Sequence, residues 1–231
     1  MRTARVSRFT GESLPDVMGY CRDHQVILLV ARCSHSDYHA VRLALASGFL
    51  LTDTLICYAK QLRDEPAVTG GGRVVVRQHD APDRKAIESI AGDAFADYCG
   101  HYHNDPRLDR GACTEVYVSW ARRSCLSQEI ADEVLIAELG GRIAGFITLK
   151  LEDEALGRIV LNAVHPEVQR KGVYSSLLSH ALRWFYRQDV RHVVTATQVA
   201  NISVQKVWCR QGFEPSGGLY TFHKWFDRVK E

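Results

Sequence analysis

The residues best suited to chemistry form a short loop between a strand-like segment and a helix-like one. Residues 158–164 are β-branched and strand-like, and the loop Gln169–Gly172 opens into an apolar face at helical spacing over about 173–188. The first turn of a helix leaves backbone N–H groups unpaired, and the helix dipole adds positive charge there. With Arg170 and Lys171, this pattern predicts a site for phosphate or pyrophosphate. A purely structural turn would give the same pattern.

A second motif lies about thirty residues further along the chain. Asn201 is suited to the N-cap of a helix over 203–211, and Gly212 to ending that helix before Phe213. Capping alone would explain both residues. Taken together, however, V-x-P-x-x-Q-x-x-G-x-Y and N-x-x-V-x-x-x-W-x-x-x-G-F resemble the GNAT superfamily of acyl-CoA N-acyltransferases. The resemblance covers residues 73–231.

This resemblance implies that coenzyme A binds at the two motifs. Backbone amides of the loop would hold its pyrophosphate, the strand through 162–164 would pair with its pantetheine arm, and Asn201 would contact the same arm. The implied cofactor-binding residues are Asn162, Ala163, Val164, Gln169, Arg170, Lys171, Gly172, Val173, Tyr174, Asn201 and Trp208.

Two positions depart from the family pattern, and both concern the proton donor. Tyr174 replaces the small residue that usually ends the loop. Trp208 stands where many relatives carry the tyrosine that protonates the departing thiolate, and an indole N–H cannot do so. Tyr174 and Tyr220 are therefore the candidate donors, although a thiol with a pKa of about 8.5 can also leave unprotonated. The backbone N–H near Val164 is the candidate for polarising the acyl carbonyl.

Residues 98–120 are dense in histidine, aspartate, arginine and aromatic residues. Such a mixture can hydrogen-bond a sugar and stack on a base, but a solvated turn with packed aromatics has the same composition. The series aromatic-H-x-D-P-R-L, Y-x-x-W at 117–120, T-Q-x-x-N at 197–201 and Y-T-F-H-K-W at 220–225 resembles N-acetyltransferases of nucleotide-linked amino sugars, of the dTDP-fucosamine acetyltransferase type. The implied substrate-binding residues are Tyr102, His103, Asp105, Arg107, Tyr117 and Trp120.

The reaction that this resemblance implies is acetyl transfer from acetyl-CoA to the amine of a dTDP- or UDP-linked deoxy-amino sugar. The amine would attack directly in a ternary complex, for surface polysaccharide synthesis, and a homodimer is left open. Two other functions share the cofactor motifs: acetylation of a protein N-terminus or small amine, and silent binding of acyl-CoA. No metal site is expected, because His101 and His103 have no second pair at ligand spacing.

The elements that must position these residues alternate between strands and helices. The Gly140–Gly141 pair predicts a hairpin between two of the strands. We expect a mixed α/β sheet layered by helices, and the resemblance implies a splayed sheet with helices on both faces. The predicted strands are 74–76, 134–139, 142–151, 158–164, 191–197 and 219–226, and the predicted helices are 82–97, 113–125, 173–188 and 203–211.

An internal echo suggests how the chain divides. Asp37 and Gly48 are eleven residues apart, as are Asn201 and Gly212, and strand-like segments flank both pairs. Chance would produce the same echo, since strand–helix–glycine–strand is common. The alternative is a smaller, degenerate GNAT-like copy over 1–69, a glycine linker at 70–72 and a catalytic domain over 73–231.

Composition excludes several classes of protein. The 231 residues are 46% hydrophobic and 24% charged, which is typical of a globular chain. A net charge of +2 lacks the basic field of a nucleic-acid-binding protein. The longest apolar run, Val26–Ala31, is far shorter than the roughly 18 residues of a membrane span, and the N-terminus has no secretory pattern. Seven cysteines without a CxxC pair favour a cytoplasmic protein with reduced thiols.

Overall fold

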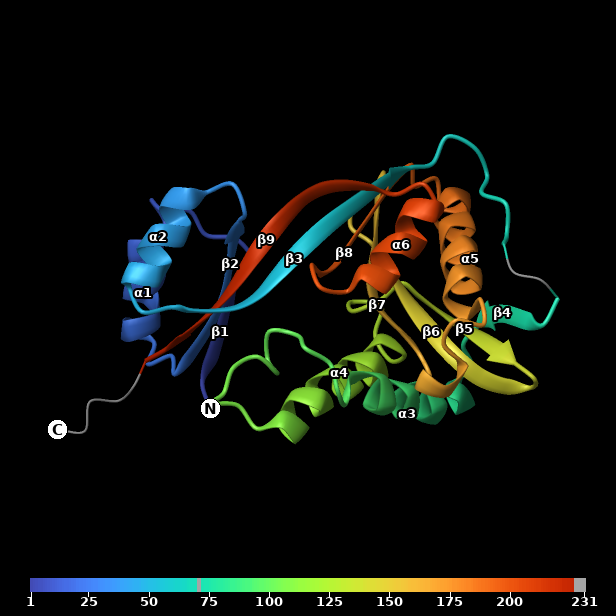
Figure 1. The fold of residues 1–231 in the computed structure, drawn as a ribbon, viewed down its shortest axis with the longest axis horizontal. Coiled ribbons are helices and arrows are strands. Elements are labelled where there is room, and N and C mark those ends of the chain that lie inside the picture. The colour runs from blue at the N-terminus through green and yellow to red at the C-terminus, as the bar shows by residue number, and fades with distance from the viewer. Residues whose placement is uncertain (70–71, 227–231) are drawn as a thin grey trace.

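The computed structural model describes residues 1–69 and 72–226 and contains a nine-stranded mixed sheet (Figure 1). Two of the predicted linker glycines, Gly70 and Gly71, lie outside the described residues. The strand order is β1-β2-β9-β3-β8-β7-β6-β5-β4. The strands are β1 (Thr3–Val6), β2 (Leu28–Ser34), β3 (Leu50–Gln61), β4 (Val74–Gln78), β5 (Glu133–Leu139), β6 (Arg142–Leu151), β7 (Leu156–Val164), β8 (His192–Gln198) and β9 (Glu214–Trp225). The α-helices are α1 (Leu14–Asp23), α2 (Tyr38–Ala46), α3 (Arg84–Phe95), α4 (Arg110–Ser124), α5 (Val173–Arg187) and α6 (Ile202–Arg210).

Helices cover both faces of the C-terminal part of the sheet, as the sequence predicted. Neighbouring residues of β5 point to opposite faces, so Ile136 packs under α3 and α4 while Leu135 packs under α5. The hairpin between β5 and β6 turns at Gly140 and Gly141, whose φ values of 61° and 76° suit a tight turn. The predicted order of elements after residue 73 is confirmed, and the mixed α/β class with it.

The N-terminal part has its own core, which the sequence analysis described only in part. Neither α1 nor β1 was predicted. Together with α2 they enclose a buried cluster that includes Phe9, Phe49 and Phe222, whose rings pack edge to face or tilted at centroid distances of 6.2–6.4 Å. Phe222 comes from β9, so the C-terminal strand is part of this N-terminal core.

The internal echo recurs in the structure as a set of elements 164 positions apart. At this spacing β2 and β8 coincide, as do α2 and α6, and β3 and β9, each with identical bounds. The positive-φ residues follow the same spacing: Gln25 and Asp189 have φ of 51° and 59°, and Gly48 and Gly212 have φ of 71° and 77°.

The two repeats exchange their last strands. In the order β2-β9-β3-β8, each repeat places its final strand between the two strands of the other, and β3 and β9 run side by side along their length (Figure 1). The strands of residues 1–69 and of the segment that begins at residue 73 therefore form one continuous sheet. The assignment of these two segments as separate domains stays a prediction.

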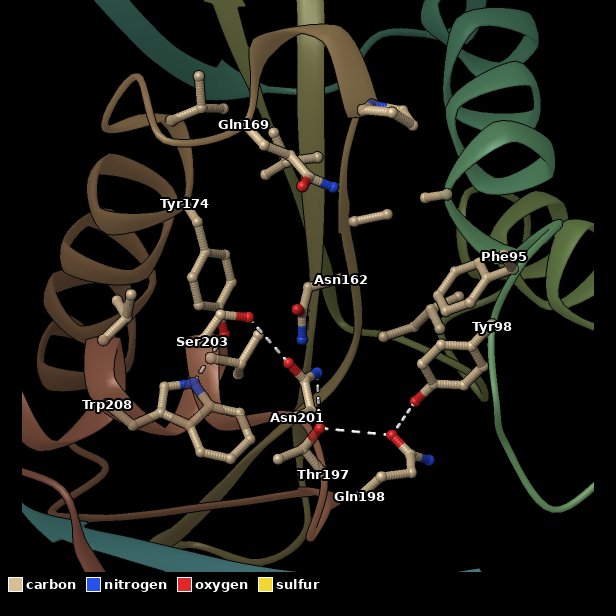
Figure 2. Close-up of a pocket in the computed structure, with 18 of the residues that line it drawn as sticks. Phe95, Tyr98, Asn162, Gln169, Tyr174, Thr197, Gln198, Asn201, Ser203 and Trp208 are labelled. Atoms are coloured by element: carbon tan, nitrogen blue, oxygen red, sulfur yellow. Dashed lines mark hydrogen bonds between the residues drawn. The ribbon is translucent and has the colours of Figure 1, made fainter.

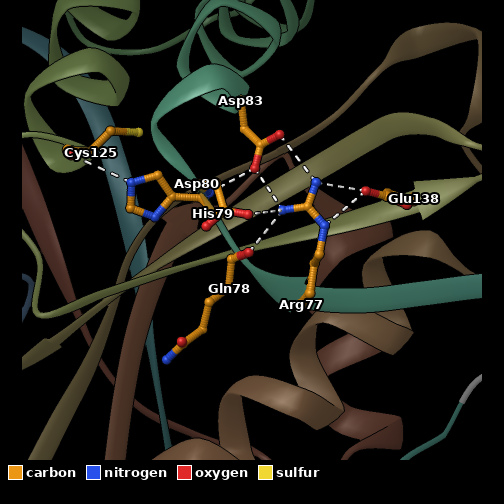
Figure 3. Close-up of polar contacts among 7 residues, drawn as sticks. All are labelled: Arg77, Gln78, His79, Asp80, Asp83, Cys125 and Glu138. Carbon is orange, nitrogen blue, oxygen red and sulfur yellow. Dashed lines mark hydrogen bonds and ion pairs between the residues drawn. The ribbon is translucent and has the colours of Figure 1, made fainter.

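An ion-pair cluster connects β4, the edge strand at the opposite end of the strand order from β1, to the start of α3 (Figure 3). The Arg77 guanidinium on β4 donates to Asp83 at 2.7 Å and pairs with Glu138 of β5 at 2.7 Å. Asp83 in turn accepts from the backbone N–H of Asp80, which closes the turn that begins the helix. These contacts hold α3, one wall of the site described below, against the sheet.

Among the described residues, no helix is long and apolar enough to cross a membrane. In the same part of the chain, no cluster of histidine, cysteine, aspartate and glutamate has the arrangement of a metal site.

Candidate active site

The site is a cleft of about 1100 Å³ where two parallel strands separate (Figure 2). β7 and β8 pair only through Leu156–Arg158 and His192–Val194. Beyond these residues both strands continue without pairing to each other, to Val164 and Gln198 respectively. The cleft occupies the resulting gap, with α3 on one side and α5 and α6 on the other.

The free edge of β7 presents backbone donors to this gap. The N–H groups of Leu161 and His165 point to the β6 side, where they donate to Thr148 Oγ1 and to the carbonyl of Ala144, each at 2.9 Å. Successive N–H groups of a strand point to opposite edges. Those of Asn162 and Val164 therefore point toward the cleft. The sequence-predicted residues 162–164 all line it.

The loop before α5 forms the end of the cleft suited to anions. Gly172 is the N-cap of α5 with a φ of 83°, and no side chain caps the helix. The first helical bond is donated by the N–H of Ser176, so the N–H groups of 173–175 lack helical partners. Arg170, together with Lys206 and Arg210 of α6, adds positive charge to the lining. Lys171, predicted beside them, is exposed and lies outside the lining.

Tyr174 and Trp208 form a hydrogen-bonded pair on the α5–α6 wall. The indole N–H of Trp208 donates to the Tyr174 hydroxyl at 2.7 Å. Trp208 is 1% exposed and packs edge to face on Tyr58 and against Phe213. Burial raises the pKa of Tyr174, against the opposing effect of the Trp208 hydrogen bond, so the phenol is protonated at neutral pH.

Asn201 occupies the predicted N-cap position of α6, but its side chain does not cap the helix. Its Nδ2 instead donates to Thr197 Oγ1 at 3.1 Å, across the end of β8. The Ser203 hydroxyl donates to the side-chain oxygen Oδ1 of Asn201 at 3.1 Å. Asn201 is therefore held by Thr197 at the end of β8 and by Ser203 in the first turn of α6, and it lines the cleft.

The wall opposite Tyr174 includes residues that the sequence analysis did not assign to the site. Phe95, the last residue of α3, and Tyr98, three residues after it, face the gap, with Gln198 of β8 beneath them (Figure 2). Tyr98 donates its hydroxyl hydrogen to Gln198 Oε1. Tyr98 and Gln198 lie within motifs already noted, at the start of 98–120 and in T-Q-x-x-N, but only the fold shows which of those residues reach the cleft.

Among the six sequence-predicted substrate-binding residues, only Tyr117 lines the cleft. Its ring stacks on Phe95 at 4.5 Å, and its side chain is 7% exposed. His103 stacks behind Tyr117 and bonds Thr114, while Tyr102 packs against the ring of His101. Trp120 packs at the edge of the α3–α4 core.

The structure assigns Asp105 and Arg107 to an anchor and not to the cleft. Asp105 accepts from His223 Nδ1 at 2.6 Å and from the Trp225 indole at 2.9 Å, and His223 Nε2 contacts His101 Nδ1 at 2.9 Å. Arg107 lies over the Trp225 ring at 4.2 Å. These contacts attach the loop between α3 and α4 to β9. No local sequence pattern indicates the hydrogen bonds of Asp105 to His223 and Trp225, because these partners lie more than 100 residues away in the sequence.

Tyr220, the second candidate donor, is also placed away from the cleft. It lies on β9 opposite Cys33 of β2 and packs at the edge of the N-terminal core, 6.4 Å from the Phe222 ring. It is absent from the cleft lining, which leaves Tyr174 as the candidate hydroxyl. Tyr220 lies there because β9 pairs with β2 and β3 and so completes the N-terminal part of the sheet.

Comparison with known proteins gives one family match and many structural neighbours. The model of the acetyltransferase (GNAT) family matches residues 98–213, half of the chain. The curated protein named spore coat polysaccharide biosynthesis protein SpsD, from Bacillus subtilis (strain 168), is 28% identical over 144 residues. That match covers 62% of this chain and 48% of the relative, so it spans about half the relative's length.

Solved structures share the fold. A GCN5-related N-acetyltransferase from Sphaerobacter thermophilus superposes with a TM-score of 0.66 at 17% identity, covering 94% of this chain and 69% of that one. A tandem GNAT protein from the clavulanic acid biosynthesis pathway superposes with a TM-score of 0.62 at 20% identity, covering 91% and 67%. At these identities the likeness concerns the fold alone.

Proposed function

Because the chain belongs to the GNAT acetyltransferase family, we propose that it transfers an acetyl group from acetyl-CoA to the amine of a nucleotide-linked deoxy-amino sugar. The observation that carries the proposal is the cleft between β7 and β8, with free strand donors along one edge and a polar aromatic wall opposite. The polysaccharide role in the name of the Bacillus relative supports a sugar acceptor.

The residues of the cleft fit coenzyme A. The unpaired N–H groups at the start of α5, with Arg170, Lys206 and Arg210 near them, suit the phosphates. The N–H groups of Asn162 and Val164 lie on an unpaired strand edge, which suits the amide groups of a pantetheine arm. The same donors suit the thioester carbonyl oxygen, as the sequence analysis expected near Val164.

Acetyl-CoA supplies a thioester whose carbonyl carbon forms the new C–N bond while the C–S bond breaks. The chain has to bring a neutral amine to that carbon and to assist the leaving sulfur. The Tyr174 hydroxyl uses one lone pair to accept from Trp208, which leaves its O–H free to donate into the cleft. We assign it the proton that the departing thiolate takes up. The proton lost by the amine passes to water, and the Tyr174 phenolate recovers a proton from water before the next turnover.

The acceptor end of the cleft is proposed at Phe95, Tyr98, Tyr117 and Gln198. Among the described residues, the Tyr117 hydroxyl has no hydrogen-bond partner, so it is available to a sugar hydroxyl or phosphate. The aromatic rings provide flat apolar faces, and Gln198 and Tyr98 provide polar atoms. This combination matches the mixed surface of a sugar.

The test is release of free thiol from acetyl-CoA in the presence of different amines. The panel contains dTDP- and UDP-linked amino sugars, a free amino sugar and a peptide with a free N-terminus. The proposal predicts turnover with one or more nucleotide-linked sugars at a kcat/KM at least tenfold above the peptide. Equal or faster turnover with the peptide would contradict the sugar acceptor. Tight binding of acetyl-CoA without turnover of any amine would favour a silent acyl-CoA-binding protein.

A further inference from the structure

A continuous row of hydrogen bonds crosses the floor of the cleft (Figure 2). Ser203 donates to Asn201 Oδ1 at 3.1 Å, and Asn201 Nδ2 donates to Thr197 Oγ1 at 3.1 Å. Thr197 donates to Gln198 Oε1 at 3.4 Å, and the Tyr98 hydroxyl donates to the same oxygen. All five residues line the cleft.

The row ends on a carboxylate from the N-terminal repeat. Gln198 Nε2 donates to Asp53 Oδ2 at 3.1 Å. Asp53 lies on β3, 8% exposed, next to a bulge in the pairing of β3 with β9. Burial raises the pKa of Asp53, while hydrogen bonds from Gln198 and from the Thr54 backbone, with the charge of Arg32, favour the ionised form.

Asp53 Oδ2 accepts from the Gln198 amide, and this contact sets the direction of the row. A glutamine amide has one donating end and one accepting end. With its Nε2 bound to Asp53, Gln198 must turn its Oε1 toward Tyr98, and Tyr98 must donate. The lone pairs of the Tyr98 oxygen are then left for the cleft.

The direction of the Tyr98 hydroxyl matters for an amine nucleophile. An oxygen that accepts an amine N–H leaves the nitrogen lone pair free to meet the thioester carbon. A hydroxyl pointing the other way would donate to that lone pair and occupy the electrons needed for the new bond.

We propose that Asp53 is a positioning residue for the acceptor amine, acting through Gln198 on Tyr98. The N-terminal repeat thus takes part in catalysis without lining the cleft. This inference rests on the proposed function for its kinetic consequence, but the direction of the hydrogen bonds is a property of the unliganded protein and is tested separately.

The kinetic test uses Asp53→Asn, which keeps the shape and allows the Gln198 amide to reverse. We expect kcat/KM for the amine to fall at least tenfold, with the Kd for coenzyme A unchanged. In a Tyr98→Phe background, Asp53→Asn should cause no further loss of kcat/KM, because Asp53 affects the amine only through the Tyr98 hydroxyl. Asp16→Asn, a change at an exposed residue of α1 in the same N-terminal part of the chain, serves as the matched control.

A rescue separates positioning from a structural role. In the double variant Asp53→Asn with Gln198→Glu, the carboxylate moves to position 198, where it accepts from both the new amide at position 53 and the Tyr98 hydroxyl. We expect the double variant to recover most of the lost kcat/KM. If Asp53→Asn alone fails to fold, the double variant still decides the question. An inactive but folded double variant would overturn the proposal, as would additive losses for Asp53→Asn and Tyr98→Phe.

The direction itself is measured by NMR on protein with ¹³Cζ-labelled tyrosine and no substrate, with the Tyr98 signal assigned through Tyr98→Phe. The Tyr98 shift should move in Asp53→Asn and return in the double variant. An unmoved shift would contradict the proposal even if the enzyme is active. A wild-type protein that acetylates no amine, with the expected shifts, would refute the proposed function and leave the hydrogen-bond direction intact.

Discussion

The Tyr174 hydroxyl oxygen lies 2.7 Å from the indole nitrogen of Trp208, which donates to it. The resemblance to the family implies a proton-donating tyrosine at the position of Trp208, and the structure places the Tyr174 hydroxyl against that tryptophan. The two side chains come from the start of α5 and the end of α6, which form one wall of the cleft. The aromatic hydroxyl at this wall of the cleft therefore comes from Tyr174 on α5 and not from the residue at position 208 on α6.

The first prediction concerns this pair. Tyr174→Phe should lower kcat about 100-fold, within the range for loss of a general acid. Trp208→Phe should lower kcat less, about tenfold, because it removes the hydrogen bond that orients the hydroxyl and keeps the hydroxyl itself. Steady-state kinetics with saturating acetyl-CoA measure both. Tyr186→Phe, on the same helix α5 but beneath Arg191, is the matched control and should leave kcat unchanged. Equal, mild effects of all three substitutions would mean that the thiolate leaves without a protein donor.

The second prediction concerns Gly172. A Cβ at this position would meet open space, but the φ of 83° is unfavourable for any β-branched residue. Gly172→Val should therefore change the loop backbone and weaken coenzyme A binding at least tenfold, or about 1.4 kcal/mol, by calorimetry. Gly140→Val is the control, since Gly140 has a φ of 61° and equally open surroundings in a hairpin outside the cleft lining. The loop assignment fails if the two variants bind coenzyme A equally well.

Local patterns predicted most of the C-terminal elements within a few residues. The helix predicted over 113–125 begins at Arg110, because the Asp109 carboxylate caps it by accepting from the Ala112 N–H. The strand through 162–164 and the loop before α5, except Lys171, line the cleft, because their backbone groups are adjacent in sequence. Their role in binding the cofactor stays a prediction.

Contacts between distant residues could not be predicted in this way. An aspartate such as Asp105 is a residue type that often binds sugars. Only the fold shows that its carboxylate accepts hydrogen bonds from His223 and Trp225. The position of Tyr220 depends on the insertion of β9 between β2 and β3, which no local pattern specifies. Gln198 and Tyr98 were missed because their importance comes from meeting each other across the floor of the cleft.

The third prediction concerns the pH dependence of stability. Burial lowers the pKa of His101 to about 2, so the folded protein keeps this imidazole neutral while the unfolded chain binds a proton below about pH 6.5. Stability should therefore fall as pH drops below about 6.5, with His101 contributing up to about 1.4 kcal/mol per pH unit. Urea unfolding of His101→Gln should show a shallower decline between pH 6.5 and 5 than the wild type. The exposed change His192→Gln should leave the slope unaltered, and an identical slope for His101→Gln would contradict the assignment.

The fourth prediction concerns the Arg77 cluster (Figure 3). Hydrogen bonds from Arg77 lower the pKa of Asp83, so its stabilising effect is present above about pH 4 and is lost as pH falls below that. Asp83→Asn should cost about 2 kcal/mol at pH 7, the size expected for a hydrogen bond to a charged group. Asp80→Asn, with an 80% exposed side chain in the same cluster, should cost much less. Equal losses in chemical denaturation would show that the Arg77–Asp83 contact is unimportant.

We propose that the separated edge of β7 and the start of α5 bind acetyl-CoA, and backbone amide NMR provides the decisive test. On titration with coenzyme A, the amide signals of Asn162, Val164 and Val173 should shift strongly. Those of Leu161 and His165, whose N–H groups are already bonded on the β6 side, should shift least within this stretch. Binding that leaves the Asn162 and Val164 signals unchanged, or no saturable binding at all, would show that coenzyme A does not bind along this edge of β7.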